Sequence, residues 1–476
     1  MGITNFHKMI KEKYGDSFKD KWLDFYDHVY VDLNYVLHFC SYNATNEEDV
    51  FARLYCFFDT ILSELLPNKT LTVCSDGVAP LAKLVLQRQR RLSVNKSKDE
   101  NAFSTMIFTP GTKFMTNLKT KLKNYFDFVK NTYCIKINYL DSEIDEAELK
   151  LKYKLMQHMK NNPDDTHIMV TNDADVVVML TTLENPCYAF VLSRTNHKNE
   201  ILSIGKMLDL HTDSVGCSVN FNYDFALISI MMGNDYLPKI RLVDFEKIWT
   251  SYKEILKVIP TGIINVENNN LKINPNFFIK LLYKLISISK QKSLNIVSIR
   301  NAFGNMYLNY LDGLTWCLHT YNTGKCVRYD YMYEYQESPH PLGLIFNIME
   351  NRELLKHNNN VSDPISSSLY AILLLPNFAK KLIDKKYHKF MEKNDILYTT
   401  EKCKECKEFY SEIQTIKNDL MVTDTETICE DTEIKINKLK KNSTELGKKL
   451  IAHKKNHDRL SLNDIKTIIS NFESFN

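Results

Sequence analysis

Two carboxylate side chains interrupt an apolar run between residues 167 and 180. Asp173 and Asp175 lie two residues apart in a stretch that is otherwise rich in Val, Ile and Leu. In a buried run of this kind an ionised carboxylate is tolerated only when it is paired or binds a metal ion, and a second one beside it raises that demand. The alternative is a turn in which Asp173 caps a helix that begins at Ala174. The chain repeats the pattern elsewhere, which favours a metal site.

Three further apolar runs end in aspartate, at Asp32, Asp76 and Asp235. The run before Asp235 is long enough to be either a strand or a buried helix. A separate segment, 141–148, carries five acids, including Glu146 and Glu148, and leads into an amphipathic helix. Taken alone, that segment is a solvated helix start whose acids favour the helix dipole.

The combined set contains only carboxylates: Asp32, Asp76, Glu146, Glu148, Asp173, Asp175 and Asp235. Hard oxygen ligands without His or Cys favour Mg²⁺ or Mn²⁺ over zinc. So many carboxylates would repel one another without cations, which argues for two ions, about 3.5 to 4 Å apart in known two-metal sites. Two such ions stabilise the attacking and leaving oxygens in phosphodiester hydrolysis.

A basic segment follows Asp76 and begins with Pro80, an ordinary residue for the start of a helix. Its donors are spaced i, i+4, i+7 and i+8, which places them on one helix face: Lys83, Gln87, Arg90 and Arg91. Arg offers bidentate donors and Lys a point charge, so this face suits an anionic phosphate near the metal site. The alternative is a solvated charged face.

Apolar strands that end in acids, separated by helical patterns, predict an α/β fold with a mainly parallel sheet and an acid cluster at the carboxyl ends of its strands. From about residue 245 the pattern becomes helical and the acid-tipped strands stop. After residue 398 the composition turns to Lys, Glu, Thr and Asn. We therefore expect an α/β catalytic domain over 1–250, a mostly helical region over 251–398 and a Lys/Glu-rich helical or mobile extension over 399–476.

Composition narrows the partners and the compartment. Lys and Arg number 61 against 58 Asp and Glu, so no global charge attracts nucleic acid and any basic surface is local. The cysteines are odd in number, 11, and scattered, which is typical of reduced thiols in a cytosol-like compartment. No run of about 18 apolar residues and no signal-peptide core occur. We expect neither a membrane segment nor secretion.

The extension contains Cys403 and Cys406 and, far downstream, His453 and His457. These spacings resemble zinc ligation, but about 12 to 15 residues usually separate such pairs, and here the separation is much larger. A zinc site in the extension is therefore disfavoured without being ruled out.

Five motifs occur in the order and context found in the eukaryotic 5′-to-3′ exoribonuclease family of the Xrn type, which the chain resembles. They are Tyr30-Val31-Asp32-Leu33-Asn34 with His38, Asp76-Gly77-Val78-Ala79-Pro80 with the basic helix, Thr109-Pro110-Gly111-Thr112, Asp173-Ala174-Asp175, and Gly233-Asn234-Asp235-Tyr236-Leu237-Pro238. The resemblance covers about 1–245 well and continues weakly through 310–316 and 363–391. It implies a nuclease core of the PIN or flap-nuclease type, in a short member that holds only the catalytic core.

The resemblance also implies roles for the site residues. Asp32, Asp76, Glu146 and Glu148 would serve mainly one cation, and Asp173, Asp175 and Asp235 mainly the other. The family's 5′-monophosphate pocket falls on Lys83, Gln87, Arg90 and Arg91. His38 matches the residue that stacks on the terminal base, and Asn34 is expected to support the site.

Departures from the family pattern limit what carries over. The family's Gly-Glu-Gly-Glu-His reads here as Asp145-Glu146-Ala147-Glu148-Leu149, which keeps both carboxylates and loses the His. Leu81 replaces an expected Arg. The family's second stacking aromatic has no clear match after Trp316.

By resemblance we expect a divalent-metal-dependent 5′-to-3′ exoribonuclease that degrades 5′-monophosphorylated single-stranded RNA to mononucleotides in RNA decay. We expect a monomer in the cytoplasm, with the nucleus as the alternative location; decapping or decay partners are not identified. One rival is a flap-endonuclease-like enzyme on DNA, disfavoured because Leu237-Pro238 follows Asp235 where that group has a Gly-rich helix-hairpin-helix. The other rival is a non-catalytic RNA-binding scaffold. The presence of all seven acids argues against this rival.

Overall fold

The computed structural model describes residues 6–92, 104–195, 198–267, 270–288, 296–335, 337–394, 397, 403–405, 408–409, 411–412, 415–416, 438–449 and 460–475. Its contacts divide into two compact units. Unit 1 comprises the described parts of Met1–Lys83, Asp99–Pro110 and Phe114–Ser367, and unit 2 those of Leu84–Lys98, Gly111–Lys113 and Ser368–Asn476. The expected domain boundaries at 250 and 398 stay predictions.

Unit 1 is built on a seven-stranded sheet in the order β1-β7-β6-β5-β2-β3-β4. The strands are β1 (Phe18–Lys19), β2 (Tyr26–Asp32), β3 (Pro67–Cys74), β4 (Lys136–Leu140), β5 (His167–Val170), β6 (Ala189–Thr195) and β7 (Lys198–Ser203). Every pair from β4 to β6 is parallel, whereas β7 pairs antiparallel with both β6 and β1. The expected α/β fold with a mainly parallel sheet is confirmed.

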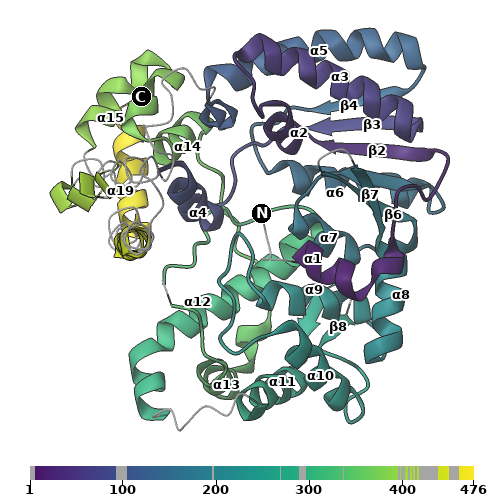
Figure 1. Cartoon of the computed structure of the whole chain (residues 1–476). Coiled ribbons are helices and arrows are strands. Elements are labelled where there is room, and N and C mark those ends of the chain that lie inside the picture. Colours follow the sequence, from purple (N-terminus) through teal and green to yellow (C-terminus); the bar gives the residue numbers. More distant parts are fainter. Residues whose placement is uncertain are drawn as a thin grey trace, which may run out of the picture. The chain divides into compact units, whose positions relative to one another are not determined.

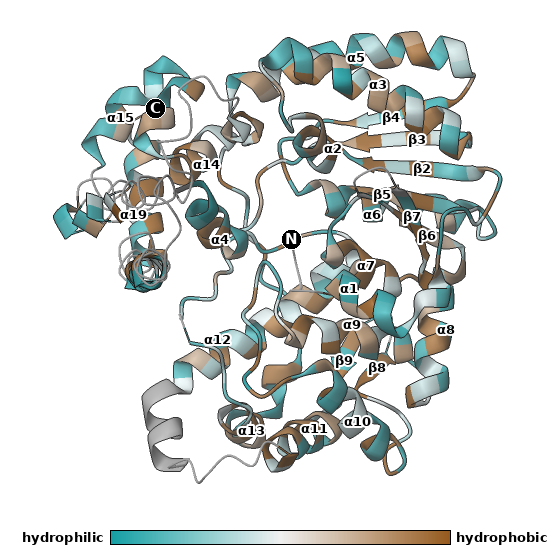
Figure 2. Cartoon of the chain, in the orientation of Figure 1, coloured by the Kyte–Doolittle hydropathy of each residue, from teal (hydrophilic) through white to brown (hydrophobic). Residues whose placement is uncertain are grey.

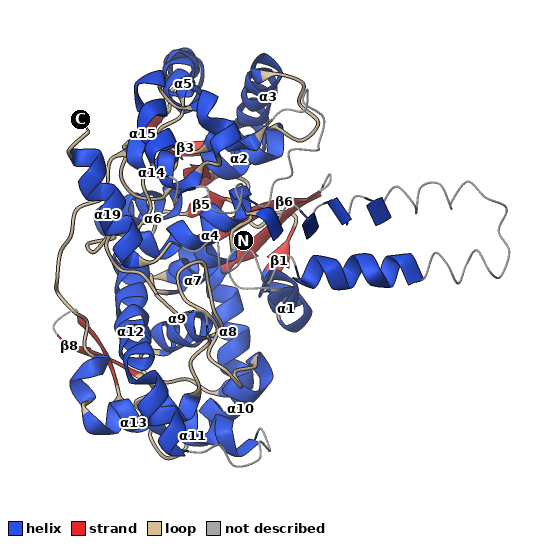
Figure 3. Cartoon of the chain, turned by 90° about the vertical axis from the view of Figure 1, so that its left-hand side faces the viewer, coloured by secondary structure: helices blue, strands red, loops and turns tan. Residues whose placement is uncertain are grey.

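Helices cover the sheet and follow its strands along the chain (Figures 1 and 3). They are α1 (Phe6–Lys13), α2 (Leu33–Cys40), α3 (Glu47–Leu65), α5 (Lys113–Tyr133), α6 (Ala147–Asn161), α7 (Ala174–Thr181), α8 (Ile204–Val215) and α9 (Phe221–Met231). A further helix, α4 (Leu81–Leu92), begins in unit 1 and continues in unit 2. Figure 2 shows brown and teal bands alternating along α5, as its apolar spacing requires. In contrast, all residues of α7 are buried. The run before Asp235 forms a buried helix, α9, and not a strand.

The rest of unit 1 is mostly helical, as expected. It contains α10 (Phe245–Leu256), the hairpin of β8 (Ile264–Glu267) and β9 (Asn270–Ile273), α11 (Pro275–Ile288), α12 (Ile296–Thr323) and α13 (Pro341–Glu350). The Asp224 carboxylate of α9 holds α10 and β8, because it accepts hydrogen bonds from Ser218 Oγ, Tyr252 OH and the backbone N–H groups of Ile263 and Ile264. A fully buried carboxylate needs this many donors to be tolerated.

Unit 2 contains the continuation of α4, α14 (Ser367–Leu374), α15 (His388–Lys393) and α19 (Leu462–Glu473). The Phe472 ring of α19 packs on Tyr387 and Phe390, at centroid distances of 5.3 and 5.2 Å. Cys406, His453 and His457, considered above for zinc, lie outside the described residues. Within the described part of the chain, each helix is too short or too polar to cross a membrane.

Candidate active site

Three of the predicted acids follow neighbouring parallel strands. Asp32 is the last residue of β2, Asp76 follows β3 and Asp173 follows β5. Because these strands are adjacent in the sheet, their carboxyl ends meet at one edge. Asp32 and Asp173 also cap α2 and α7, since each accepts a hydrogen bond from a backbone N–H two residues on. The capping role and the place in an acid cluster therefore coexist.

Asn34 connects the first two acids. The Asp32 carboxylate accepts from the Asn34 backbone N–H at 3.0 Å and from Thr171 Oγ1 at 3.0 Å. The Asn34 side chain donates to Asp76 Oδ2 at 2.5 Å, and Asp76 Oδ1 accepts from the Ala147 backbone N–H at 2.9 Å. Asp76 is thereby fixed against the start of α6, the helix that carries Glu148.

The acidic loop before α6 reaches the sheet edge by pairing with the segment after β3. Val78 bridges Ile144, and the Gly77 backbone N–H donates to Asp145 O at 2.8 Å. A Cβ at Gly77 would lie 2.4 Å from the Glu143 carbonyl carbon, so only glycine permits this approach. The pairing brings Glu146 and Glu148 beside Asp76, although their segment lies far along the chain.

The remaining acids come from helix ends. Asp175 lies in the first turn of α7 with 4% of its surface exposed, and its Oδ1 atom has no hydrogen-bond partner. Asp235 is 5% exposed and lies in the turn after α9. The Asn234 side chain shapes this turn, because its Oδ1 atom accepts from the backbone N–H groups of Tyr236 and Leu237 at 3.0 and 2.9 Å.

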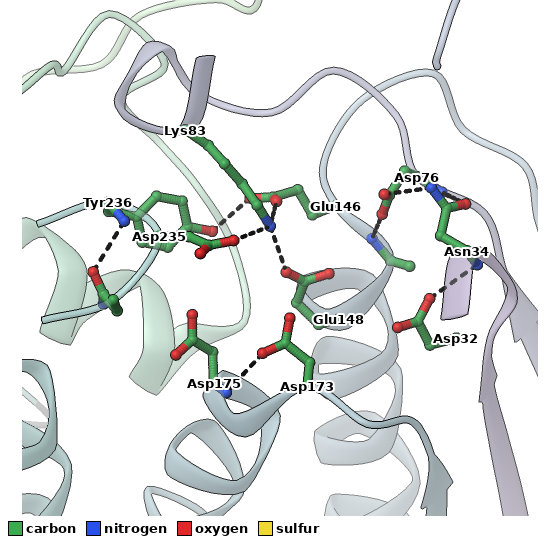
Figure 4. A network of polar contacts seen from close by, with 12 residues as sticks. Asp32, Asn34, Asp76, Lys83, Glu146, Glu148, Asp173, Asp175, Asp235 and Tyr236 are labelled. Atoms are coloured by element: carbon green, nitrogen blue, oxygen red, sulfur yellow. Dashed lines mark hydrogen bonds and ion pairs between the residues drawn. The ribbon is translucent and has the colours of Figure 1, made fainter. Parts of the chain in front are cut away.

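Lys83 points into this acid cluster (Figure 4). Its ammonium contacts Glu146 Oε1 and lies 3.2 Å from Glu148 Oε1 and 3.6 Å from Asp235 Oδ2. Glu146 Oε2 accepts a further hydrogen bond from Tyr236 OH at 2.5 Å. Lys83 therefore lies against the predicted metal ligands, and its expected contact with a substrate phosphate stays a prediction.

The other predicted substrate residues have contacts within their own units. Gln87 Oε1 accepts from Tyr370 OH at 2.9 Å, and Arg91 Nη1 donates to the Gln87 carbonyl at 3.2 Å. Gln87, Arg90 and Arg91 belong to unit 2 and Lys83 to unit 1, so the convergence of all four stays a prediction. His38 is an exposed residue of α2 whose ring contacts Phe108 edge-on at 5.3 Å.

Burial and crowding set the charge state of the cluster. Burial raises the pKa of Asp32, and the Asp76 and Glu148 carboxylates raise it further. Burial also raises the pKa of Asp175, with Asp173 adding to the effect. For Lys83 burial lowers the pKa, but the carboxylates around its ammonium outweigh burial and raise it well above the usual value. The site therefore favours positive charge and disfavours further ionised carboxylates.

The donor set fits Mg²⁺ or Mn²⁺. It consists of carboxylate oxygens, the ligands that these hard cations prefer, and Asp175 Oδ1 is buried without a donor. Among the described residues, no group of three acidic, His or Cys side chains is already arranged to hold an ion. The Lys83 ammonium lies between three of the acids and partly neutralises them.

Three side chains that hold the site together were not predicted in these roles. Thr171 donates to Asp32, and Tyr236 donates to Glu146. Each lies within a segment already recognised from its acids, so the signal was a polar group at the end of an apolar run. Lys150 was also missed; its Nζ atom donates to the carbonyls of Ser75 and Ser142 and fastens the acidic loop.

Fold and site define an α/β protein with a buried carboxylate cluster at the carboxyl edge of a parallel sheet. Residues 1–193 match the family model described as the N-terminus of the XRN 5′-3′ exonucleases. This match agrees with the resemblance to the Xrn family that the motifs of residues 1–193 predicted.

Named relatives agree with this placement. The chain is 25% identical over 335 residues to 5′-3′ exoribonuclease 1 of Saccharomyces cerevisiae, covering 58% of this chain and 22% of the relative. It is 23% identical over 385 residues to the human 5′-3′ exoribonuclease 1, covering 66% and 22%. A 5′-3′ exoribonuclease 2 homolog of Caenorhabditis elegans is 28% identical over 193 residues, covering 32% and 20%. The chain thus spans about a fifth of the length of these relatives.

Solved structures show a weaker likeness. The catalytic core of Rad2 in complex with DNA substrate aligns with a TM-score of 0.36 at 13% identity, covering 83% of this chain and 98% of that one. The flap endonuclease of bacteriophage T5 aligns with a TM-score of 0.32 at 13% identity, covering 62% and 98%. These scores are too low to carry an argument about function.

Proposed function

We propose that this protein is a divalent-metal-dependent 5′-to-3′ exoribonuclease that removes mononucleotides from 5′-monophosphorylated single-stranded RNA. The observation that carries the proposal is the gathering of seven carboxylates in one site, of which Glu146 is 1% and Asp175 4% exposed. Such a site is costly unless cations enter it. The named relatives that share this region are 5′-3′ exoribonucleases.

The protein's own part in the reaction is to place charge and to orient the carboxylates. Bound Mg²⁺ or Mn²⁺ would supply activation of a water nucleophile and stabilisation of the leaving oxygen. Asp32 and Asp76 are fixed by Thr171 and Asn34, so they keep their orientation without rearranging during the reaction. Tyr236 orients Glu146 in the same way.

The 5′ end would be recognised by charge and by stacking. Arg90 and Arg91 present guanidinium donors on α4, which suit the oxygens of a 5′-monophosphate. His38 is an exposed ring supported edge-on by Phe108, a geometry suited to stacking on a terminal base. The arginines would select for a phosphate and the His38 ring for an unpaired terminal base.

The experiment is degradation, in Mg²⁺, of RNAs that differ only in the 5′ end: monophosphate, triphosphate, hydroxyl or cap. We expect rapid loss of the monophosphate RNA and slow loss of the other three. Equal rates for all four ends would contradict recognition of the 5′-monophosphate. A branched DNA flap is tested beside these RNAs to examine the flap-endonuclease alternative. The segment after Asp235 runs through turns to α10 and forms no helix-hairpin-helix, which argues against that alternative.

A further inference from the structure

Lys83 is a buried cation that directly contacts the acid cluster. Its side chain is 8% exposed, and the carboxylates that it contacts are buried to a similar degree, with side-chain exposures of 2% for Glu146, 8% for Glu148 and 3% for Asp235. Figure 4 shows the ammonium between these three groups, which arrive from α6 and from the turn after α9. An ammonium shared among three buried carboxylates is a counter-ion and not a surface pair.

A divalent cation and this ammonium compete for the same oxygens. Mg²⁺ binds carboxylate oxygens at about 2.0 to 2.1 Å, closer than an ammonium donor approaches. If both cations lay among the three carboxylates, their like charges would repel each other in a poorly hydrated site. The lysine stem has four flexible carbons, so its ammonium can leave without moving α4.

We propose that Lys83 is an exchangeable counter-ion: its ammonium neutralises Glu146, Glu148 and Asp235 until a divalent cation binds, and the cation then releases it toward an anionic phosphate of the substrate. This inference rests on the proposed function, because it assumes that the acid cluster is the metal site. The exchange of Lys83 couples binding of the divalent cation to binding of the substrate phosphate. Metal entry makes one more positive charge available to the substrate, so metal and phosphate strengthen each other's binding.

The first test measures Mn²⁺ affinity by calorimetry on the full chain. Lys83→Met removes the competing charge, and we expect it to bind Mn²⁺ about tenfold more tightly than the unaltered protein. Lys119→Met is the matched control, because Lys119 pairs with Asp141 at 2.9 Å on the exposed part of the same acidic segment. We expect the control to bind Mn²⁺ as the unaltered protein does. Equal or weaker Mn²⁺ binding by Lys83→Met overturns the exchange.

Two further variants keep this test decisive. Lys83→Gln replaces Lys83→Met if circular dichroism shows that the methionine variant is unfolded. Asp173→Asn with Asp175→Asn removes metal ligands, so Mn²⁺ binding should fall sharply. If the unaltered protein and this double variant bind Mn²⁺ equally poorly, the proposed function itself fails. If only the gain in Lys83→Met is missing, the exchange fails and the proposed function stands.

The second test measures the coupling without turnover. The probe is an RNA with a methylphosphonate at its first internucleotide linkage, carrying either a 5′-monophosphate or a 5′-hydroxyl. In the unaltered protein we expect Mn²⁺ to strengthen binding of the 5′-phosphorylated probe more than that of the hydroxyl probe. In Lys83→Met this phosphate-dependent gain should be lost. A gain of the same size in both proteins overturns the release of Lys83.

Discussion

At the scale of single residues, the site depends on side chains that hold the acids as much as on the acids themselves. Asn34 touches both Asp32 and Asp76, through its backbone N–H and its side chain. We expect Asn34→Ala to lower the apparent Mn²⁺ affinity and the rate of RNA cleavage by about 10- to 100-fold, as loss of a group that orients metal ligands does. The measurement is the Mn²⁺ dependence of RNA cleavage.

The control for Asn34 is Asn199→Ala. Asn199 also donates an amide hydrogen bond to a carboxylate, Glu64 at 2.8 Å, but does so on the surface away from the cluster. We expect this control to keep normal Mn²⁺ dependence. Unchanged Mn²⁺ dependence in Asn34→Ala would mean that Asp76 does not need the amide.

A histidine group at the amino end of the sheet predicts a pH effect on stability. Burial lowers the pKa of His167 to about 3, and Tyr30 OH contacts its Nδ1 atom at 3.0 Å. Because the folded pKa lies below the unfolded value of about 6.5, the unfolded chain binds the proton first as the pH falls. The stability that His167 contributes is therefore complete above about pH 6.5 and is lost between that pH and the folded pKa.

His167→Gln isolates this contribution from that of the other buried groups. Between pH 7 and pH 5 the unaltered protein should lose about 2 kcal/mol more unfolding free energy than the variant, since each pKa unit is worth about 1.36 kcal/mol. Urea unfolding at both pH values measures the difference. Identical pH dependence in the two proteins would show that the folded and unfolded states bind the His167 proton in the same pH range, and would contradict the lowered pKa.

At the scale of elements, the sequence located the seven acids but not how they come together. Strand ends could be predicted because apolar runs followed by Asp are local patterns, as at Asp32 and Asp76. The docking of Glu146 and Glu148 could not, because it depends on the bridge between Val78 and Ile144, which lie far apart in the sequence. The run before Asp235 left strand or helix open, and the structure shows a helix, α9, most of whose residues are buried.

Gly77→Ala tests that docking. The added Cβ would lie 2.4 Å from backbone atoms of Glu143, so the acidic loop must move away from the sheet edge. We expect a loss of about 1 to 3 kcal/mol in unfolding free energy together with weaker Mn²⁺ binding. Gly15→Ala is the control, because no atom lies within 4 Å of the place that its added methyl group would occupy. Normal Mn²⁺ binding in Gly77→Ala would show that metal binding does not depend on the docking of the acidic loop.

Lys83 illustrates the limit of helix-face reasoning. It shares a face with Gln87, Arg90 and Arg91 by spacing, and that pattern predicted a common ligand. Spacing along a helix does not tell which neighbours each residue meets. Lys83 lies in the first turn of α4, a short distance along the chain from Asp76, and its ammonium contacts the acids.

At the scale of the whole chain, composition left the last residues open between a helical and a mobile extension. The segment 399–476 averages to a Lys/Glu-rich stretch, yet its end forms α19, with a capping box between Ser461 and Asp464 and a buried Phe472. A single amphipathic helix is hidden when composition is averaged over a long polar stretch. Residues 1–193, in contrast, carry a family pattern that the sequence showed clearly.

Phe472→Ala tests the packing of α19 within unit 2. Phe472 is 5% exposed and contacts two aromatic rings, so we expect a loss of about 3 to 5 kcal/mol in local stability. Hydrogen exchange in α15 and α19 should accelerate. Phe378→Ala, at a ring that is 36% exposed, should have a much smaller effect. Unchanged exchange in α19 of the Phe472 variant would contradict the packing.

The central claim is that the carboxylate cluster cuts RNA from its 5′ end with the help of divalent cations. The most direct test follows a 5′-monophosphorylated RNA with a 3′ label in Mg²⁺, using the unaltered protein and the double variant Asp173→Asn with Asp175→Asn. We predict that the unaltered protein releases mononucleotides from the 5′ end, and that the double variant and an EDTA-treated sample leave the RNA intact. Intact RNA with the unaltered protein, or equal degradation by the double variant, would contradict the account.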